Sequence, residues 1–392
     1  QELFLGMGHI AEREVELPEA VISKLLRIAA EDTSIVSLSV GEPDFPAPKP
    51  IVEFTKEFAD KCNHYSSPAG RKELREAICK KLKNDNNIEA HPDNVIVTTG
   101  SQEAILLAAA CLLDVSEQII IPTPGFLGYL PAMELLNIFP VPLELREDED
   151  WEINPDRLRR LVDPKKTKAI ILNTPSNPTG TVLSRRTLEA IADIARDCKL
   201  YIFADEAYEK LVYGKEHVSI ASLNGMREYV ITLHTFSKSY AMCGYRVGYA
   251  VGPKNVIAAM TKVHAYTTLC APTISQLVAT KALSIDNKYV EVMRREYDRR
   301  RKFIAKRLNE MELTTVTPYG AFYTFSSIKH LGFDSSMKFA FDLLKEAKVA
   351  VMPGSEFGAY GEGYIRCSYA TKLSKIEEAM HRLEKFVKKH KK

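Results

Sequence analysis

The chain has 392 residues, of which 45% are hydrophobic and 27% are charged, and its formal net charge is only +2. This length is enough for two domains and a large buried core. The small net charge argues against nucleic-acid or membrane-surface binding that depends on bulk charge. The one concentrated basic run, Lys388–Lys392, is expected to be a frayed and solvated helix end rather than a binding patch.

Seven cysteines are scattered along the chain without a Cys-x-x-Cys pair. We expect them to be reduced thiols of the core in a cytoplasmic protein, forming neither a disulfide framework nor a zinc site. No apolar run reaches the 18 residues that a membrane helix needs, and the first residues lack the layout of a secretory signal peptide. The sequence therefore predicts no metal site and no membrane or nucleic-acid partner.

The N-terminal segment contains one amphipathic pattern, and we expect it to pack on the C-terminal part of the chain. Its apolar residues are spaced for one helix face, at Val21, Ile22, Leu25, Leu26, Ile28 and Ala29.

Short apolar runs then alternate with helical patterns. The predicted strands cover residues 94–98, 118–121, 168–172, 200–204, 230–233 and 246–251. Helical patterns lie between them, for instance at residues 102–113 and 187–198. Continuously apolar strands that alternate with helices indicate an α/β fold with a mostly parallel central sheet, covered by helices on both faces.

A long charged helix is predicted from Ser275 through Arg307, and it leads into a smaller α+β part. We therefore expect three units. They are an N-terminal arm at residues 1–45, a large α/β domain at 46–280 and a small C-terminal domain at 281–392.

A lysine with hydroxyls on both sides follows the strand predicted at residues 230–233. Lys238 lies between Ser237 and Ser239, and Arg246 follows eight residues later. Ligands of open α/β sheets bind beyond the carboxyl ends of strands. A lysine amine can form a Schiff base with an aldehyde cofactor, while hydroxyls and an arginine can hold its phosphate. A surface lysine in a turn is the commoner case, so the prediction depends on the whole group.

Two further polar segments follow predicted strands. Thr98–Ala104 leads into a helix, whose first backbone N–H groups and dipole favour an anion. Ser101 alternatively serves only as the cap of that helix. Asp205 follows the strand at residues 200–204, and burying an Asp is costly unless a partner such as a pyridinium N–H compensates its charge.

Two later motifs add an amide and a guanidinium. Asn173–Gly180 has the pattern N-x-P-x-N-P-T-G, and a structural turn requires its Pro and Gly residues but not Asn177. Arg366 lies in the strand-like run Tyr364–Ala370. Its planar fork suits a bidentate carboxylate contact, although a surface salt bridge is the alternative.

These motifs, together with Ser39–Phe45, His64–Ala77 and Pro124–Tyr129, resemble those of the class I and II aminotransferases. This is the aspartate/aromatic aminotransferase family of pyridoxal-phosphate (PLP) enzymes, of fold type I. The resemblance follows the family's order from Gly41 to Ala370. It implies fold type I with a smaller α+β C-terminal domain, PLP as the cofactor, and a role in amino-acid metabolism.

The resemblance also implies roles for individual residues. Lys238 would hold PLP and then transfer the proton between substrate and cofactor carbons, Asp205 would pair with the pyridine nitrogen, and Tyr208 would donate to the cofactor's phenolic oxygen. The further implied cofactor contacts are Gly100, Ser101, Gln102, Phe126, Asn177, Thr235, Ser237, Arg246 and, from the partner subunit, Tyr65. Phe126 would stack on the ring but has no polar group, a mild departure from the family.

Substrate contacts are implied at Gly41, Asn177 and Arg366, with Arg366 binding the α-carboxylate. If Tyr65 reaches the partner subunit's cofactor rather than packing locally, the protein is a homodimer with shared active sites. The expected substrates are an amino acid and a 2-oxo acid, and analogy with the family indicates 2-oxoglutarate as the 2-oxo acid.

The motifs leave the donor side chain open among aspartate, aromatic and broad specificity. In one family branch the partner's arginine binds a distal carboxylate, but residues 262–270 contain no arginine. Tyr266, Thr267 and Thr268 would suit an adaptable pocket. Two other functions stay open, a β-lyase that uses the same cofactor and a non-catalytic regulator. The regulator is disfavoured because no basic helix-turn-helix pattern precedes Gly41.

Overall fold

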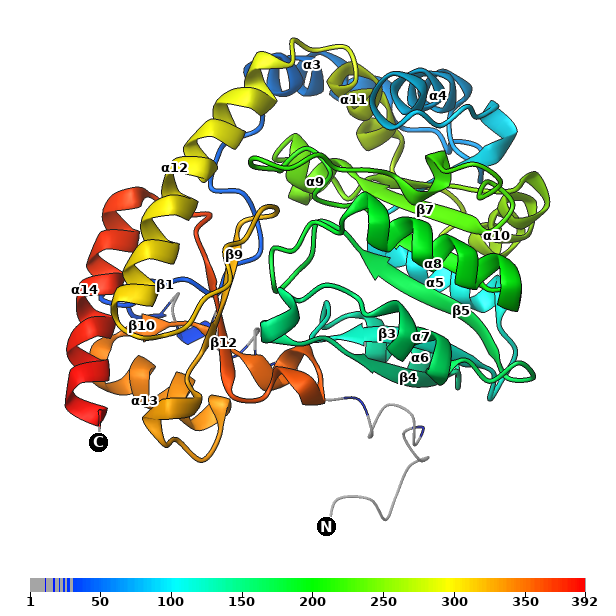
Figure 1. Cartoon of the computed structure of the whole chain (residues 1–392). Helices are drawn as coiled ribbons and strands as arrows, with labels where there is room; N and C mark the ends of the chain where they lie inside the picture. The colour runs from blue at the N-terminus through cyan, green and yellow to red at the C-terminus, as the bar shows by residue number, and fades with distance from the viewer. Residues whose placement is uncertain are drawn as a thin grey trace, which may run out of the picture.

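The computed structural model describes residues 31–391, together with residues 11, 17, 21, 24, 27 and 28. A seven-stranded sheet with helices on both faces forms the larger part of the molecule, and a smaller α+β part lies beside it (Figure 1). The arrangement confirms the predicted α/β class and its mostly parallel central sheet.

The large sheet has the strand order β2-β8-β7-β6-β5-β3-β4. Its strands are β2 (Val95–Thr98), β3 (Gln118–Thr123), β4 (Phe139–Glu144), β5 (Thr167–Asn173), β6 (Tyr201–Asp205), β7 (Val230–Thr235) and β8 (Gly248–Val251). β8 runs antiparallel to both of its neighbours, and the other paired strands are parallel.

Two details of the sheet differ from the sequence-based expectation. β8 begins at Gly248 rather than Arg246, because Arg246 has a left-handed backbone with φ +50°. β4 is not among the predicted strands, because Pro140 and Pro142 weaken its strand pattern. Proline is tolerated there because β4 is the last strand of the sheet and one side of it needs no ladder partner.

Helices cover both faces of the large sheet (Figure 1). They are α3 (Lys49–Phe58), α4 (Lys72–Asn86), α5 (Ser101–Leu112), α6 (Tyr129–Leu135), α7 (Pro155–Leu161), α8 (Arg185–Cys198), α9 (Phe236–Ser239), α10 (Lys254–Thr267) and α11 (Thr273–Ala282). Along β6, Ile202 and Ala204 belong to the core under α4 and α8, whereas Phe203 belongs to the core under α5 and α10. Burial on both faces explains why this strand is continuously apolar.

The C-terminal part has its own core and a three-stranded antiparallel sheet in the order β11-β12-β9. Its elements are α12 (Lys288–Glu310), β9 (Tyr323–Ser327), α13 (Ser336–Ala347), β10 (Val349–Ala350), β11 (Met352–Pro353), β12 (Tyr364–Ser368) and α14 (Leu373–His390). β10 pairs in parallel with β1 (Val36–Ser37), so the segment before the large sheet is tied to the end of the chain.

The prediction of one helix from Ser275 through Arg307 is wrong. The helix breaks between Ala282 and Lys288, and separate helices α11 and α12 result. The Asp286 carboxylate accepts a hydrogen bond from the Lys288 backbone N–H (2.9 Å), which favours a new helix start over continuation of the first.

The N-terminal prediction is tested at a few positions. Val21 and Ile28 are helical and half-buried, whereas Ile22, Leu25, Leu26 and Ala29 lie outside the described residues. The Lys24 ammonium lies 5.3 Å from the ring centroid of Phe341 on α13. This contact agrees with the expected packing on the C-terminal part.

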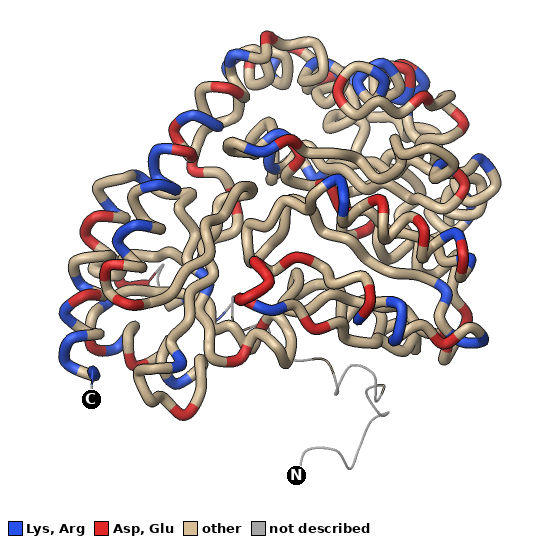
Figure 2. The backbone as a smooth tube through the Cα atoms, in the orientation of Figure 1, with Lys and Arg blue, Asp and Glu red and all other residues tan. Residues whose placement is uncertain are grey.

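The basic tail is not frayed as predicted, because α14 continues through His390. Lys389 pairs with Glu346 and Lys391 with Glu312, both at 2.6 Å. Figure 2 shows that basic and acidic residues alternate along α12 and α14, so the charges of this surface largely compensate one another.

The seven cysteines are free thiols, but only Cys367 is buried and the other six are half-buried. The expectation of core thiols therefore holds fully for Cys367 alone. None of the described helices combines the length and the apolar character that crossing a bilayer requires.

Gly180 connects the two parts of the molecule, and its substitution tests that contact. It has φ +71°, and a Cβ atom there would lie 2.4 Å from Pro318 Cβ. We expect Gly180→Ala to lower the thermal midpoint by at least about 3 °C more than Gly214→Ala, measured by circular dichroism. Gly214 is the matched control, since it also has a positive φ (+69°) but no atom within 4 Å of its added Cβ. Equal shifts for the two variants would contradict the contact.

Candidate active site

The predicted polar residues meet at one edge of the large sheet. Asn173 and Asp205 are register partners at the ends of β5 and β6, and Thr235 ends the neighbouring β7. Gly248 pairs with both Thr235 and Thr98. Because β8 runs in the opposite direction, its first residues lie at the same edge as the ends of these strands, which brings in Arg246.

A cavity of about 450 Å³ opens at this edge, a size typical of small-molecule sites. The predicted site residues that line it are Gly41, Gly100, Ser101, Gln102, Phe126, Asn177, Asp205, Tyr208, Thr235, Ser237, Lys238, Arg246 and Arg366. A larger hollow of about 970 Å³ lies by α3, α4 and α11 and contains none of them. The smaller cavity is therefore the candidate active site.

One end of the cavity forms an anion cup, which we define as Gly100, Ser101, Thr235, Ser237 and Arg246. Arg246 Nη2 donates to the backbone carbonyl of Thr99 (3.2 Å), just before the cup's first residue. Gly100 has φ +105°, and a Cβ atom there would lie 2.9 Å from Arg246 Nη2. Only glycine leaves room for the guanidinium at this point.

The start of α5 belongs to the cup, and its geometry settles one alternative. Gly100, not Ser101, is the N-cap residue, and no side chain caps this helix. The reading of Ser101 as only a cap is therefore wrong. Ser101 is the first residue of α5, and at this end of a helix the dipole favours an anion.

Lys238 extends from α9, directly after β7, and its Nζ donates to the backbone carbonyl of Gly41 (2.6 Å). Nζ also lies 5.9 Å from the ring centroid of Tyr208. No ion pair of Lys238 is found within the described part of the chain. The amine is thus held by a neutral acceptor and stays available to a ligand.

Asp205 is buried at the end of β6. Its Oδ2 accepts a hydrogen bond from Tyr129 Oη (2.6 Å), and its Oδ1 accepts one from the backbone N–H of Ala207 (3.2 Å). Burial raises the pKa of Asp205, and the Tyr129 hydrogen bond opposes that effect. Asp205 forms no ion pair with any residue that the structure describes.

Arg366 is also buried, on β12. Its Nη1 donates to Asn177 Oδ1 (2.9 Å) and its Nη2 to the backbone carbonyl of Ser39 (2.8 Å), whereas Nε has no partner. The guanidinium carbon lies 4.3 Å from the ring centroid of Tyr323. Since no carboxylate of residues 31–391 pairs with it, Arg366 is a buried cation without a counterion in this range. The alternative interpretation of Arg366, a surface salt bridge, is therefore wrong.

Two tyrosines of the site were missed in the sequence. Tyr129, the first residue of α6, supports Asp205 and packs edge-on against Phe126, three residues earlier. Tyr323 lines the cavity and shares a hydrogen bond with Tyr208, with 2.8 Å between the two oxygens. Tyr323 ends the segment Pro318–Tyr323, whose pattern P-x-G-A-F-Y does not by itself indicate a site role for the tyrosine.

Two predicted residues do not reach the cavity of their own chain. Tyr65 and Tyr266 are 85% and 88% exposed, respectively, and neither lines the site. This exposure disagrees with local packing of Tyr65. It also disagrees with a substrate pocket that Tyr266 would form within one chain.

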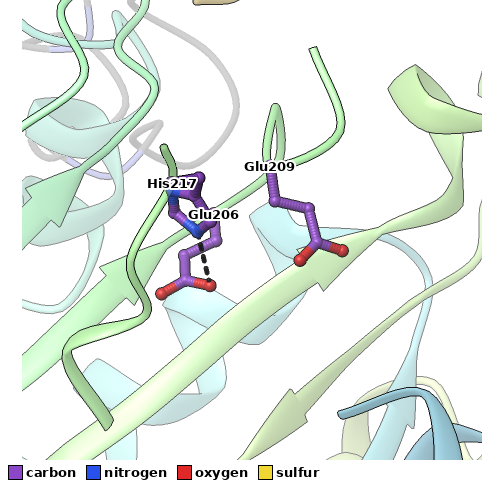
Figure 3. Close-up of side chains that lie close together, drawn as sticks. All are labelled: Glu206, Glu209 and His217. Carbon is purple, nitrogen blue, oxygen red and sulfur yellow. Dashed lines mark hydrogen bonds and ion pairs between the residues drawn. The ribbon is translucent and has the colours of Figure 1, made fainter. Parts of the chain in front are cut away.

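A second polar cluster begins at Glu206, the residue after Asp205, and its residues do not line the cavity. Figure 3 shows its members Glu206, Glu209 and His217. Glu206, Glu209 and His217 bring potential metal-ligand atoms within 4.8 Å of one another. Both carboxylates already have protein donors, since Glu206 accepts from Ser219 Oγ (2.7 Å) and Glu209 pairs with the Lys81 ammonium. Burial opposes ionisation of Glu209, but Lys81 lowers its pKa well below the usual range. We therefore interpret the cluster as a buried ion-pair network.

Known proteins resemble this chain over almost its whole length. The family model "Aminotransferase class I and II" matches residues 33–383. An aspartate aminotransferase of Pyrococcus abyssi is 47% identical, covering 94% of this chain and 96% of the relative. An aromatic-amino-acid aminotransferase 2 of Thermococcus litoralis is 46% identical with the same coverage. The crystal structure of an aromatic aminotransferase from Pyrococcus horikoshii superimposes with a TM-score of 0.89 at 45% identity, covering 94% of this chain and 99% of that one.

The anion cup predicts binding of inorganic phosphate to the cofactor-free protein. Arg246→Gln should weaken that binding about tenfold or more, because it removes a charge-assisted contact from the cup. Isothermal titration calorimetry measures the affinity. Arg185→Gln, at an exposed position of α8, is the matched control and should leave the affinity unchanged. An unchanged affinity in Arg246→Gln would contradict the assignment of the cup.

Proposed function

The chain belongs to the class I and II aminotransferases, and we propose that its cavity binds PLP and transfers the amino group of aspartate and aromatic amino acids. Aminotransferases convert an amino acid and a 2-oxo acid into the corresponding 2-oxo acid and amino acid. The proposal therefore concerns the cofactor, the residues that hold it and the substrates.

One observation carries the proposal: a single cavity contains a buried carboxylate and a buried guanidinium, and neither has an ionic partner among the described residues. Asp205 and Arg366 both line the cavity. A buried charge without a partner is costly. A ligand with a cationic ring nitrogen and a substrate with a carboxylate would compensate both charges, and PLP with an amino acid supplies these groups.

The other lining residues fit PLP as well. The anion cup matches a phosphate group, with backbone N–H groups, hydroxyls and Arg246 as donors. Phe126 offers a ring face, and Asn177 and Tyr208 offer donors for the phenolic oxygen. Asp205 would hold the pyridine nitrogen, and Tyr129 would hold Asp205 in place. We propose that Gly100 and Ser101 of the cup, together with the adjacent Gln102, contact the cofactor at the start of α5.

When bound, PLP supplies an electron sink for the charge that develops at the donor's Cα atom. Asp205 contributes by keeping the ring nitrogen protonated, and its own burial raises its pKa while Tyr129 opposes the rise. The Lys238 amine would take the proton from the donor's Cα atom and deliver it to the former aldehyde carbon of the cofactor, acting as general base and then as general acid. In the second half of the cycle it would transfer a proton in the reverse direction. Its neutral partner, the carbonyl of Gly41, leaves the amine free to move.

Substrate binding would rest on Arg366 and Asn177. Arg366 has its Nε without a partner and a fork that suits an α-carboxylate, and Asn177 fixes the fork through Nη1. Gly41 allows a close approach, since a Cβ atom there would lie 3.0 Å from Tyr323 Oη.

We propose broad donor specificity, with 2-oxoglutarate as the acceptor. Among the described lining residues, the only arginines are Arg246 and Arg366, and both already have assigned roles. The wall near them is formed partly by Phe126, Leu127 and Tyr323. Such a wall accepts an aromatic ring, and the names of the relatives include both aspartate and aromatic aminotransferases.

We further propose a homodimer with shared active sites, in the cytoplasm. The exposure of Tyr65 and Tyr266 supports it, since large aromatic side chains on a surface suit an interface. The partner subunit's Tyr65 would then complete the anion cup. The free thiols support a cytoplasmic location, because thiols are kept reduced in that compartment. We also propose the division of the chain into an N-terminal arm (residues 1–45), a large domain (46–280) and a small C-terminal domain (281–392).

A half-reaction panel tests the function. The PLP-loaded protein is mixed with one amino acid at a time, without acceptor, and the cofactor's absorbance is followed. We expect the band to bleach stoichiometrically and to return when 2-oxoglutarate is added. Rates with aspartate, phenylalanine and alanine should lie within about a hundredfold of one another, since an apolar wall discriminates weakly.

Arginine variants provide the control for this panel. Arg366→Lys keeps the charge but loses the fork, so it should raise the half-saturating donor concentration, whereas Arg185→Lys on exposed α8 should not. Aspartate rates at least about a hundredfold above the others would contradict the broad pocket. A persistent band, with pyruvate and ammonia released from a single amino acid, would contradict the aminotransferase assignment.

A further inference from the structure

Thr99 lies between the anion cup and a second charged group behind it. Its backbone carbonyl accepts from Arg246 Nη2 (3.2 Å), on the side of the cup. Its backbone N–H and its hydroxyl both donate to Glu103 Oε2, each at 2.6 Å. Glu103 thus fixes the same peptide segment that positions the cup's arginine.

The other oxygen of Glu103 meets the end of α10. Glu103 Oε1 accepts from Thr268 Oγ1 (2.5 Å) and lies 3.4 Å from His264 Nε2. The His264 side chain is fully buried, and its Nδ1 lies 2.8 Å from the backbone carbonyl of Pro68. Pro68 belongs to the loop that follows Tyr65. His264 therefore connects the cup with that loop.

The groups that face the two ring nitrogens indicate the charge of His264. A carbonyl can only accept, so Nδ1 carries a proton toward Pro68. Nε2 forms no hydrogen bond with the described residues, but it lies 3.4 Å from Glu103 Oε1. A carboxylate oxygen at this distance repels a lone pair and therefore favours a proton on Nε2 as well. Burial lowers the pKa of His264, but Glu103 and Pro68 raise it above its usual value. Burial likewise raises the pKa of Glu103, but its donors lower it to about 2.

We propose that Glu103 and His264 form a buried ion pair that positions the anion cup for the cofactor's phosphate. Glu103 holds Thr99, Thr99 holds Arg246, and His264 holds Glu103 in its ionised form. The same histidine anchors the loop that carries Tyr65. These two residues act through others and touch neither cofactor nor substrate in the proposed site. The inference rests on the proposed function, since it takes the cup to bind phosphate.

His264→Gln tests the proposal with a readout other than turnover. The cofactor-free protein is titrated with PLP and, separately, with pyridoxal, which lacks the phosphate. We expect the affinity for PLP to fall about tenfold or more and that for pyridoxal to change less than about threefold. His381→Gln, at an exposed position of α14, is the matched control and should change neither affinity.

An unchanged PLP affinity in His264→Gln would overturn the proposal. An equal loss for PLP and pyridoxal would also overturn it, because a merely structural role weakens both. If His264→Gln does not fold, Thr268→Val replaces it, since this change removes only an exposed donor to Glu103. Thr268→Val should weaken PLP binding by a smaller factor than His264→Gln and should again leave pyridoxal binding nearly unchanged. Equal losses of affinity for PLP and pyridoxal in this variant would overturn the proposal. Failure of the wild-type protein to bind PLP would instead refute the proposed function.

Discussion

Two buried charges of opposite sign determine how the cavity is built. Asp205 and Arg366 come from different parts of the molecule, β6 of the large sheet and β12 of the small one. Each is held by neutral groups, Asp205 by Tyr129 and Arg366 by Asn177. Neutral donors and acceptors orient a charge without neutralising it, so each charge stays available to a ligand. The stability lost by burying them would be regained when cofactor and substrate bind.

The topology of the sheet makes this arrangement possible. Parallel strands place their carboxyl ends at one edge, and the reversed strand β8 adds its amino end there, which brings Arg246 to the cup. Gly100 leaves room for the guanidinium, and Thr99 connects it to Glu103. The contact between Gly180 and Pro318 then fixes the small sheet, with Arg366, over the same edge.

Much of this arrangement follows from sequence, because motifs such as those around Lys238 and Asp205 place reactive groups directly after apolar strands. Contacts between residues that lie far apart in the chain could not be predicted from the sequence. Tyr129 reaches Asp205 across 76 residues, and nothing local in the sequence indicates that contact. The break between α11 and α12 was missed because the helical pattern of the sequence continues through it, whereas the local hydrogen bond from the Lys288 N–H to Asp286 is visible only in the structure. β4 was missed because its prolines are tolerated only at a sheet edge.

The central claim is that the Lys238 amine carries the cofactor. The most direct measurement is reduction of the PLP-loaded wild-type protein with sodium borohydride, which fixes the cofactor's carbon to the amine that holds it, followed by peptide mass mapping. We expect a phosphopyridoxyl group on Lys238 and on no other lysine. A group on a different lysine, or one spread over several lysines, would contradict it.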